Sequence, residues 1–245
     1  MDDAKWTQRL SKWAFRIAVA APLIAGVALT LARYDIIPKI GGLYAMMVGA
    51  LVAAVALLLA IIGLIMALRF GATTKRLAMI ALAISGAYLG YMASRAAVAR
   101  SVPPIHDITT DLVDPPAFSA ITLRSDNLVG VGTTENWRAI HARTYGDLDS
   151  VTIARPAATV IADAERLARA NGWEVAAADA ASGRVEATAS VSFIRFKDDV
   201  VIRVRPSADG ASSVVDMRSV SRIGVSDLGV NAVRIRTFLA DLSRG

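Results

Sequence analysis

Three long apolar stretches dominate the first hundred residues of the chain. They run from about Ile17 to Ala32, from Leu43 to Leu68 and from Leu77 to Ala93. The second stretch contains no charged residue, so a helix built from it has no polar face to turn toward water. About 20 apolar residues in a helix cross the hydrocarbon core of a bilayer. The pattern therefore predicts three membrane-spanning helices, over about residues 14–33, 43–68 and 77–96.

Two other interpretations of these stretches are weaker. Three buried helices of a soluble protein would each need a polar face, which the second stretch lacks. A cleaved signal peptide over the first stretch would need a better cleavage site than Thr30-Leu31-Ala32, and two further apolar stretches follow it. A retained signal-anchor fits the first stretch better.

The distribution of basic residues predicts how these helices are oriented. Cytoplasmic loops carry an excess of Lys and Arg. Seven basic residues precede the first span or lie between the second and third, whereas four lie between the first and second or follow the third. We therefore expect an inner-membrane protein with a cytoplasmic N-terminus and a periplasmic C-terminal domain. The seven are Lys5, Arg9, Lys12, Arg16, Arg69, Lys75 and Arg76, and the four are Arg33, Lys39, Arg95 and Arg100.

The pattern changes after the membrane domain (residues 1–100). Pro103 and Pro104 cannot continue a helix, and residues 101–148 are rich in turn formers. They predict a linker and an irregular segment that covers a folded core, with a short helix near Glu135–Arg143. In residues 149–245, Val200, Ile202 and Val204 alternate with polar or outward-facing positions, which is typical of a half-buried strand.

The rest of residues 149–245 extends this pattern to a whole domain. Two amphipathic helices are expected, one at Ala157–Asn171 and one that follows Ser226 as its N-cap. The predicted order is β-α-β-β-β-β-α. The fold class is therefore a membrane-anchored α+β protein, with three transmembrane helices followed by an antiparallel sheet that has two helices packed on one face. The predicted strands are Val151–Ile153, Trp173–Ala178, Val185–Phe193, Asp199–Pro206 and Ser213–Val220.

Charge and composition exclude several classes of protein. The first hundred residues hold 11 Lys and Arg against 3 Asp and Glu, and the remainder holds 16 against 18. The basic character thus belongs to the membrane flanks, and it does not indicate a nucleic-acid partner. The chain has no cysteine and two histidines, which excludes a disulfide scaffold, a Cys-ligated metal and a His-rich metal site. We predict no metal and no cofactor.

Four arginines form a candidate anion-binding site on the polar face of the predicted sheet. Guanidinium groups bind phosphate and carboxylate in a bidentate manner, so an anionic lipid, a cell-wall fragment or an acidic partner segment would fit. A solvated lattice of cross-strand ion pairs with Glu186 and Asp216 explains the same residues without a ligand. The four arginines are Arg203, Arg205, Arg218 and Arg222.

The segment before the last helix is a second candidate ligand site. Ser226 and Asn231 lie where backbone N–H groups of a helix N-terminus favour an anion. A capped turn with glycines at positive φ is the structural alternative for the same residues. Both residues are therefore included among the candidate ligand-binding residues.

Gly86 and Gly90 form a GxxxG pair in the third apolar stretch. Small residues at this spacing let two helices approach closely. The pair predicts helix packing, either inside the three-helix bundle of this chain or in a homo-oligomer or a complex with a membrane protein partner.

Catalytic chemistry finds little support in the sequence. His106, Asp107 and Asp111 have loop spacing, which fits turn hydrogen bonds better than acid–base work. Sequence motifs for a nucleophile elbow, a phosphate-binding loop or a zinc protease are missing. We assign no catalytic residue, and an enzyme is the less favoured interpretation.

Several motifs of the C-terminal part resemble a known family. They are Ile105–Asp111 with Pro115–Phe118, Gly172–Val175 with Gly183–Thr188, and Lys197–Pro206 with Asp216–Gly229. In this order they resemble the bacterial domain of unknown function 1499 family, over about residues 105–245, whereas residues 120–148 match it poorly. The resemblance implies a bacterial envelope protein. It implies no reaction whose residues could be transferred.

These observations together predict a non-enzymatic multi-pass membrane protein. Its extracytoplasmic α+β domain is expected to bind an envelope component, either an anionic lipid or a cell-wall fragment, or a partner protein. The alternatives are an accessory subunit of a larger inner-membrane complex and, less favoured, a hydrolase.

Overall fold

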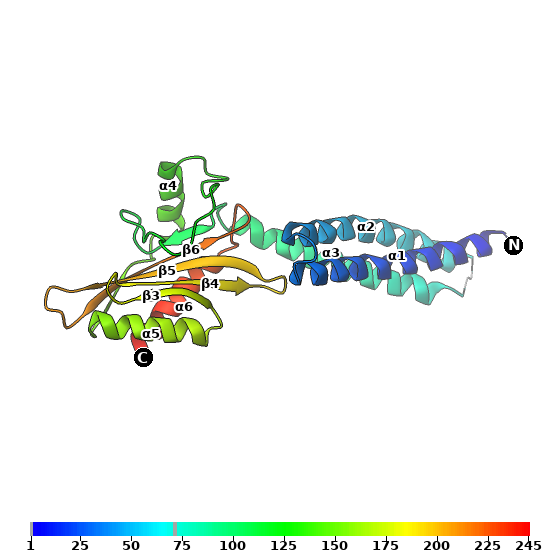
Figure 1. Cartoon of the computed structure of the whole chain (residues 1–245). Coiled ribbons are helices and arrows are strands. Elements are labelled where there is room, and N and C mark those ends of the chain that lie inside the picture. Colours follow the sequence, from blue (N-terminus) through cyan, green and yellow to red (C-terminus); the bar gives the residue numbers. More distant parts are fainter. Residues whose placement is uncertain (1, 71–72) are drawn as a thin grey trace. The chain divides into compact units, whose positions relative to one another are not determined.

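The computed structural model describes residues 2–70 and 73–245 (Figure 1). The chain divides into two compact units, one that ends at Arg100 and one over Ser101–Gly245. The first unit consists of helices α1 (Asp2–Arg33), α2 (Lys39–Arg69) and α3 (Lys75–Ser101). All three are long and apolar enough to cross a membrane, which confirms the prediction of three apolar helices.

Small residues bring α1 and α2 together. Ala14 and Ala18 of α1 are buried in one cluster with Ala56 and Ala60 of α2. A Cβ added at Gly42 would lie 2.8 Å from the Cβ of Ala32, so only glycine permits this backbone approach. Close packing through small side chains is the usual way in which helices associate in lipid.

Gly86 and Gly90 lie on an exposed face of α3. A Cβ added at either glycine meets nothing within 4 Å among the described residues. The contact between α3 and α2 lies elsewhere, where the Tyr88 hydroxyl donates to the Met46 carbonyl oxygen at 3.0 Å. Within residues 2–70 and 73–245 no close helix contact forms at the two glycines, and helix packing through them stays a prediction.

The second unit contains one antiparallel sheet of six strands, in the order β1-β6-β5-β4-β3, with β2 also paired to β6. Strands β1 and β2 share the outer edge of β6, opposite its C-terminal and N-terminal residues respectively. The predicted antiparallel sheet is thus confirmed, and β1 is an additional short strand. The strands are β1 (Asp107–Thr109), β2 (Val151–Ile153), β3 (Glu174–Asp179), β4 (Arg184–Val191), β5 (Phe196–Pro206) and β6 (Ser213–Ser221).

Helices α5 (Ala157–Ala170) and α6 (Val230–Arg244) cover one face of this sheet, as predicted (Figure 1). Ile202 and Met217 of the sheet and Phe238 of α6 are buried in the core between them. The ring of Phe238 stacks on Trp173 at a centroid distance of 4.9 Å. Hydrophobic burial at this layer is the main stabilising contribution to the unit.

Helix α6 begins at Val230, not directly after Ser226. Asp227 fills the capping role, because its carboxylate accepts from the backbone N–H groups of Gly229 at 2.9 Å and Asn231 at 2.7 Å. The prediction that Ser226 caps this helix is therefore wrong. A carboxylate accepts hydrogen bonds from such N–H groups, which lack a backbone partner, more strongly than a hydroxyl does, because the carboxylate is charged.

Helix α4 (Thr134–Tyr145) closes the free edge of β1. The indole N–H of Trp137 donates to the Asp107 carbonyl oxygen at 2.8 Å, and the Thr109 N–H donates to Nε2 of His141 at 3.1 Å. These bonds satisfy the backbone groups that β1 does not present to β6. An edge strand left open would offer a template for another chain.

Candidate functional site

The polar face of the sheet gathers the candidate residues. The register pairs Arg203 with Asp216 across β5 and β6, and Glu186 with Val201 across β4 and β5. Because side chains alternate along strands, Glu186, Arg203, Asp216 and Arg218 face the side of the sheet opposite α5 and α6. The structure thus brings together the residues that the alternation had placed on one surface.

Arg203 is at the centre of the first ion-pair cluster. Its Nε donates to Asp216 Oδ2 at 3.0 Å, and its terminal nitrogens reach Asp114 Oδ2 at 2.7 Å and Asp111 Oδ2 at 3.1 Å. Asp216 is fully buried and also pairs with Arg205 at 2.8 Å. Three carboxylates therefore surround Arg203, and two of them come from residues 111–114.

Arg218 binds one carboxylate in the bidentate manner expected of a ligand site. Its Nε and Nη2 donate to the two oxygens of Asp107 at 2.8 and 2.6 Å. Asn127 also donates to Asp107, at 2.5 Å, and Arg218 lies 6.0 Å from the ring centroid of Phe118. Asp107, a side chain of the same chain, thus pairs with Arg218 in the structure, and binding of an external anion stays a prediction.

Arg222 forms a third pair at the end of the sheet. It donates to both oxygens of Asp199, with a shortest distance of 2.8 Å, and to the Thr188 hydroxyl at 3.1 Å. Asp199 is buried, whereas the Arg222 side chain is 47% exposed. The hydrogen bond and charge of Asp199 raise the pKa of Arg222 further above its usual value, against the opposing effect of burial.

Glu186 is one of the buried carboxylates that the sequence did not indicate as site residues. It has no exposed surface, and its carboxylate accepts four hydrogen bonds from one loop. Ser119 donates through its N–H and its hydroxyl, both at 2.7 Å, and the N–H groups of Ala120 and Ile121 donate at 3.0 and 2.8 Å. This loop belongs to the irregular segment and is fixed over the polar face.

Ser226 and Asn231 are bound into the structure at the start of α6. The Ser226 hydroxyl donates to the Pro103 carbonyl oxygen at 3.1 Å. Asn231 is fully buried, where it donates to the His106 carbonyl oxygen at 2.9 Å and accepts from the Ser219 hydroxyl at 2.8 Å. Both residues therefore have internal partners, and a ligand role for them stays a prediction.

The two histidines lie in separate buried environments. His141 accepts from Thr109 and packs edge-on between the rings of Trp137 and Tyr145. Burial lowers its pKa. His106 lies beside Asn127, with 3.3 Å between Nε2 and Oδ1. Burial, with the charge of Arg124 as a second cause, lowers the pKa of His106.

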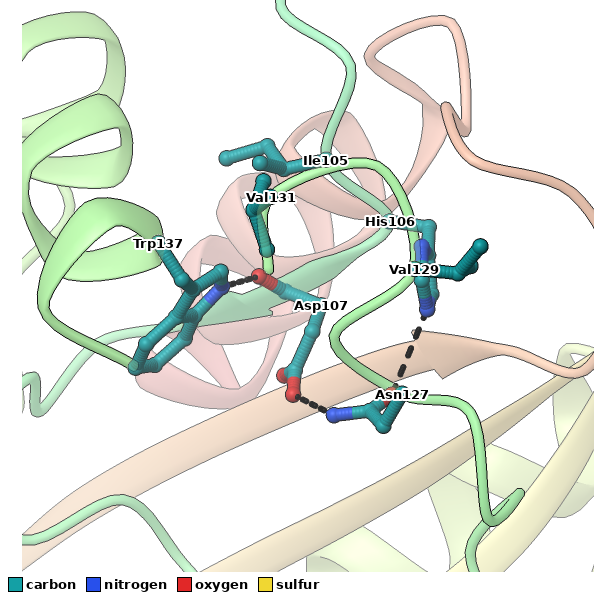
Figure 2. A pocket seen from close by; sticks show the side chains of 7 residues that line it. All are labelled: Ile105, His106, Asp107, Asn127, Val129, Val131 and Trp137. Atoms are coloured by element: carbon teal, nitrogen blue, oxygen red, sulfur yellow. Dashed lines mark hydrogen bonds between the residues drawn. The ribbon is translucent and has the colours of Figure 1, made fainter. Parts of the chain in front are cut away.

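A pocket next to His106 is shown in Figure 2. Its lining leaves no room for a water molecule, so it does not have the dimensions of a ligand site. Within residues 2–70 and 73–245, no group of three or more His, Asp or Glu side chains could hold a metal ion. The pocket is lined by Ile105, His106, Asp107, Asn127, Val129, Val131 and Trp137.

Comparison with known proteins agrees with the resemblance of the sequence motifs. A profile of the family described as "Protein of unknown function (DUF1499)" matches residues 107–242. The chain belongs to the DUF1499 family. The matched residues include every strand of the sheet, helices α4 and α5 and most of α6. A search of curated proteins finds no match.

The charged network described above thus lies within the DUF1499 domain. Asp107 of β1, Arg203 of β5 and Arg218 of β6 all fall inside the matched residues. The three apolar helices precede the domain.

Proposed function

We propose that this DUF1499 protein is a non-enzymatic protein of the bacterial inner membrane whose α+β domain is a docking module in the periplasm. The three apolar helices support insertion into a membrane. The excess of basic residues at one end of the spans supports a cytoplasmic N-terminus, and an odd number of spans then puts the domain on the other side. The docked component is an envelope polymer or lipid, or a partner protein.

The observation that carries this proposal is the internal pairing of the charged sheet face. Arg203, Arg218 and Arg222 each hold a carboxylate of the same chain, and residues 111–121 bond to the face from above. Buried carboxylates need such partners, because an unpaired charge is costly away from water. The network therefore supports a rigid scaffold that binds through its outer surface, more than it supports a catalytic cleft.

The positions of the two most exposed of the four candidate arginines favour a large partner over a small anion. The side chains of Arg205 and Arg222 are 48% and 47% exposed. The Arg222 N–H bonds to the Lys197 carbonyl oxygen, which lies eight residues before Arg205 on β5. At about 3.3 Å per residue, this places the two backbones roughly 26 Å apart. A polymer, a headgroup surface or an acidic protein face spans that distance.

The exposed glycines of α3 support a second candidate function, that of an accessory subunit of a membrane complex. Gly86 and Gly90 have open space beside them among the described residues. Small residues on an open helix face allow another transmembrane helix to approach closely. The docked partner would then be held in the membrane and not by the α+β domain.

Native mass spectrometry of the full chain after gentle extraction tests the docking function. We expect the wild-type chain to retain a lipid, glycan or protein mass that the Arg205→Ala variant loses. Arg166→Ala is the matched control, because Arg166 is 70% exposed on α5 and pairs with Asp163. Loss of the mass in Gly86→Leu instead would favour the accessory subunit. A wild-type chain that retains nothing, even after cross-linking in cells, would contradict both functions.

A further inference from the structure

Four apolar side chains are exposed at one end of the sheet. Phe193 lies in the β4–β5 hairpin loop, and Ile223, Val225 and Leu228 lie in the loop between β6 and α6; their exposed fractions range from 38% to 56%. We call these four residues the apolar tip. Several exposed apolar side chains at one end of a folded domain make that end a candidate interaction site.

The sheet register puts both loops at the same end of the domain (Figure 1). Asp198 of β5 pairs with Ser221 of β6, and the Arg222 N–H then donates to the Lys197 carbonyl oxygen at 3.0 Å. The hairpin loop that contains Phe193 lies just beyond this point, because β5 begins at Phe196. The chain therefore leaves β6 alongside the hairpin loop.

The chain also enters the domain at this end. Ser226 donates to the Pro103 carbonyl oxygen at 3.1 Å, and the Asp227 N–H donates to the Ile105 carbonyl oxygen at 3.3 Å. Ser101 is the last residue of α3. The loop of the apolar tip is thus bonded to residues that follow Ser101 by only two to four positions along the chain.

The length of α3 sets the depth of Ser101, where the domain is attached, in the bilayer. A span over residues 77–96 fills the hydrocarbon core of about 30 Å, and Ser101 lies five residues, or about 7.5 Å, further along the helix. The headgroup layer on each side of the core is about 5–7.5 Å thick. Ser101, and with it the attachment point of the domain, therefore lies at the headgroup layer.

The backbone around Leu228 holds its side chain outward. Leu228 has φ +56°, a conformation that bulky residues rarely adopt. Its N–H donates to the Ser226 hydroxyl at 3.2 Å, and the next N–H, of Gly229, donates to Asp227 at 2.9 Å. An exposed leucine in a strained conformation is unfavourable for the isolated domain, and such strain is characteristic of residues that serve an interaction.

We infer that the apolar tip inserts into the boundary between lipid headgroups and acyl chains and so fixes the orientation of the α+β domain on the bilayer. Phe193 and the three aliphatic side chains lose contact with water there, which is favourable. The exposed Arg195 and Arg222 flank them and face anionic headgroups. The inference needs only that α3 crosses the bilayer, so it holds or fails independently of what binds at Arg205.

The absence of cysteine from the chain makes a direct test straightforward. Single variants Phe193→Cys, Val225→Cys and Leu228→Cys of the full chain are labelled with a polarity-sensitive fluorophore and placed in nanodiscs of phosphatidylethanolamine and phosphatidylglycerol. Val113→Cys, at an 89% exposed position over the sheet face, and Ala211→Cys, in the exposed β5–β6 turn at the other end of β6, are the controls.

Labels buried about 5–10 Å at the headgroup–acyl boundary should be quenched by shallow spin-labelled lipids at least about three times as strongly as the two control labels. Aqueous iodide should quench the tip labels less than the control labels. Iodide quenching of the tip labels equal to that of the controls would overturn the inference. Tip labels shielded from both iodide and the lipid quencher would also overturn it, because a protein would then cover the tip.

Discussion

Glu186 is a buried carboxylate that connects residues 119–121 of the irregular segment to the sheet. The Glu186 carboxylate accepts hydrogen bonds from three backbone N–H groups and one hydroxyl of residues 119–121. Hydrogen bonds to a buried charge are stronger than neutral ones, and donors left without an acceptor cost the most. This residue therefore holds the segment in place more than any ion pair at the surface does.

Glu186→Ala should lower the free energy of unfolding of the α+β domain by about 3 kcal/mol, because the loop N–H groups lose their acceptor. The measurement is urea unfolding of the solubilised full chain, followed by the fluorescence of Trp137 and Trp173. The matched control is Glu174→Ala, which removes an exposed pair with Lys197 and should cost less than about 1 kcal/mol. Equal costs for the two variants would contradict this role of Glu186.

His141 predicts a dependence of stability on pH. Burial lowers its pKa from 6.5, so the folded domain holds the neutral form, whose Nε2 accepts from Thr109. The stability that neutral His141 gives to the folded domain is complete above the pKa of the unfolded state, about 6.5. This stability is lost as the pH falls from there toward the lowered pKa of the folded state. The pKa of His106 is also lowered, so this residue too makes the folded domain less stable as the pH falls.

Between about pH 7.5 and pH 5, the free energy of unfolding of the wild-type domain should therefore fall, by at most about 1.4 kcal/mol per pH unit for each histidine. His141→Gln keeps an acceptor but does not titrate, so its unfolding free energy should depend less steeply on pH over this range. A His141→Gln slope as steep as that of the wild type would show that other groups cause the effect.

Alternation along the strands was sufficient to predict that Arg203 and Asp216 share a face, because it fixes side-chain direction within each strand. It could not predict the partners of Arg203 from residues 111–114, about 90 positions earlier in the chain. Residues 111–121 have no periodicity that places them in space. The carboxylates that neutralise the predicted anion site were therefore visible only in the structure.

At the scale of elements, a comparison of two glycines at positive φ shows how much stability depends on backbone conformation and how much on space for a side chain. Gly172, after α5, has φ +74° and open space for a Cβ, whereas Gly183, in the β3–β4 turn, has φ +64° and would place a Cβ 2.4 Å from the Val204 carbonyl oxygen. The Gly183 carbonyl also accepts from the Val204 N–H at 2.7 Å.

Gly172→Ala should cost about 1 kcal/mol from the left-handed conformation alone. Gly183→Ala should cost about 3 kcal/mol or more, because β5 must also move. Thermal unfolding of the two variants, followed by near-ultraviolet circular dichroism, compares them directly. If Gly183→Ala is no less stable than Gly172→Ala, the turn has more freedom than the structure shows.

Strands with a long alternating pattern were predictable, and so was the three-residue β2 (Val151–Ile153), whereas the equally short β1 was not. The eight residues of β4 and the eleven of β5 alternate long enough to indicate strands. The three residues of β1 are a strand only because β6 pairs with them on one side and Trp137 and His141 bond to them on the other. Such pairing is a tertiary property, and it leaves no local signal in the sequence.

At the scale of the whole molecule, the exposed glycines of α3 predict association between chains. Gly86→Ile and Gly90→Ile should leave the three helices folded, because a Cβ added at either position meets nothing within 4 Å among the described residues. The same variants should lower the association constant of the oligomer or complex in mild detergent by about tenfold for a loss of about 1.4 kcal/mol of association free energy. A wild-type chain that is monomeric at all concentrations would contradict the prediction.

The proposed function depends on a location of the domain outside the cytoplasm, which cysteine accessibility can test. The cysteine-free chain permits single cysteines at the exposed Val113 of the domain and at the exposed Thr73 between α2 and α3. In intact spheroplasts, a membrane-impermeant maleimide should label Val113→Cys before lysis and Thr73→Cys only after lysis. Labelling of Thr73→Cys but not Val113→Cys before lysis would put the domain in the cytoplasm and contradict the account.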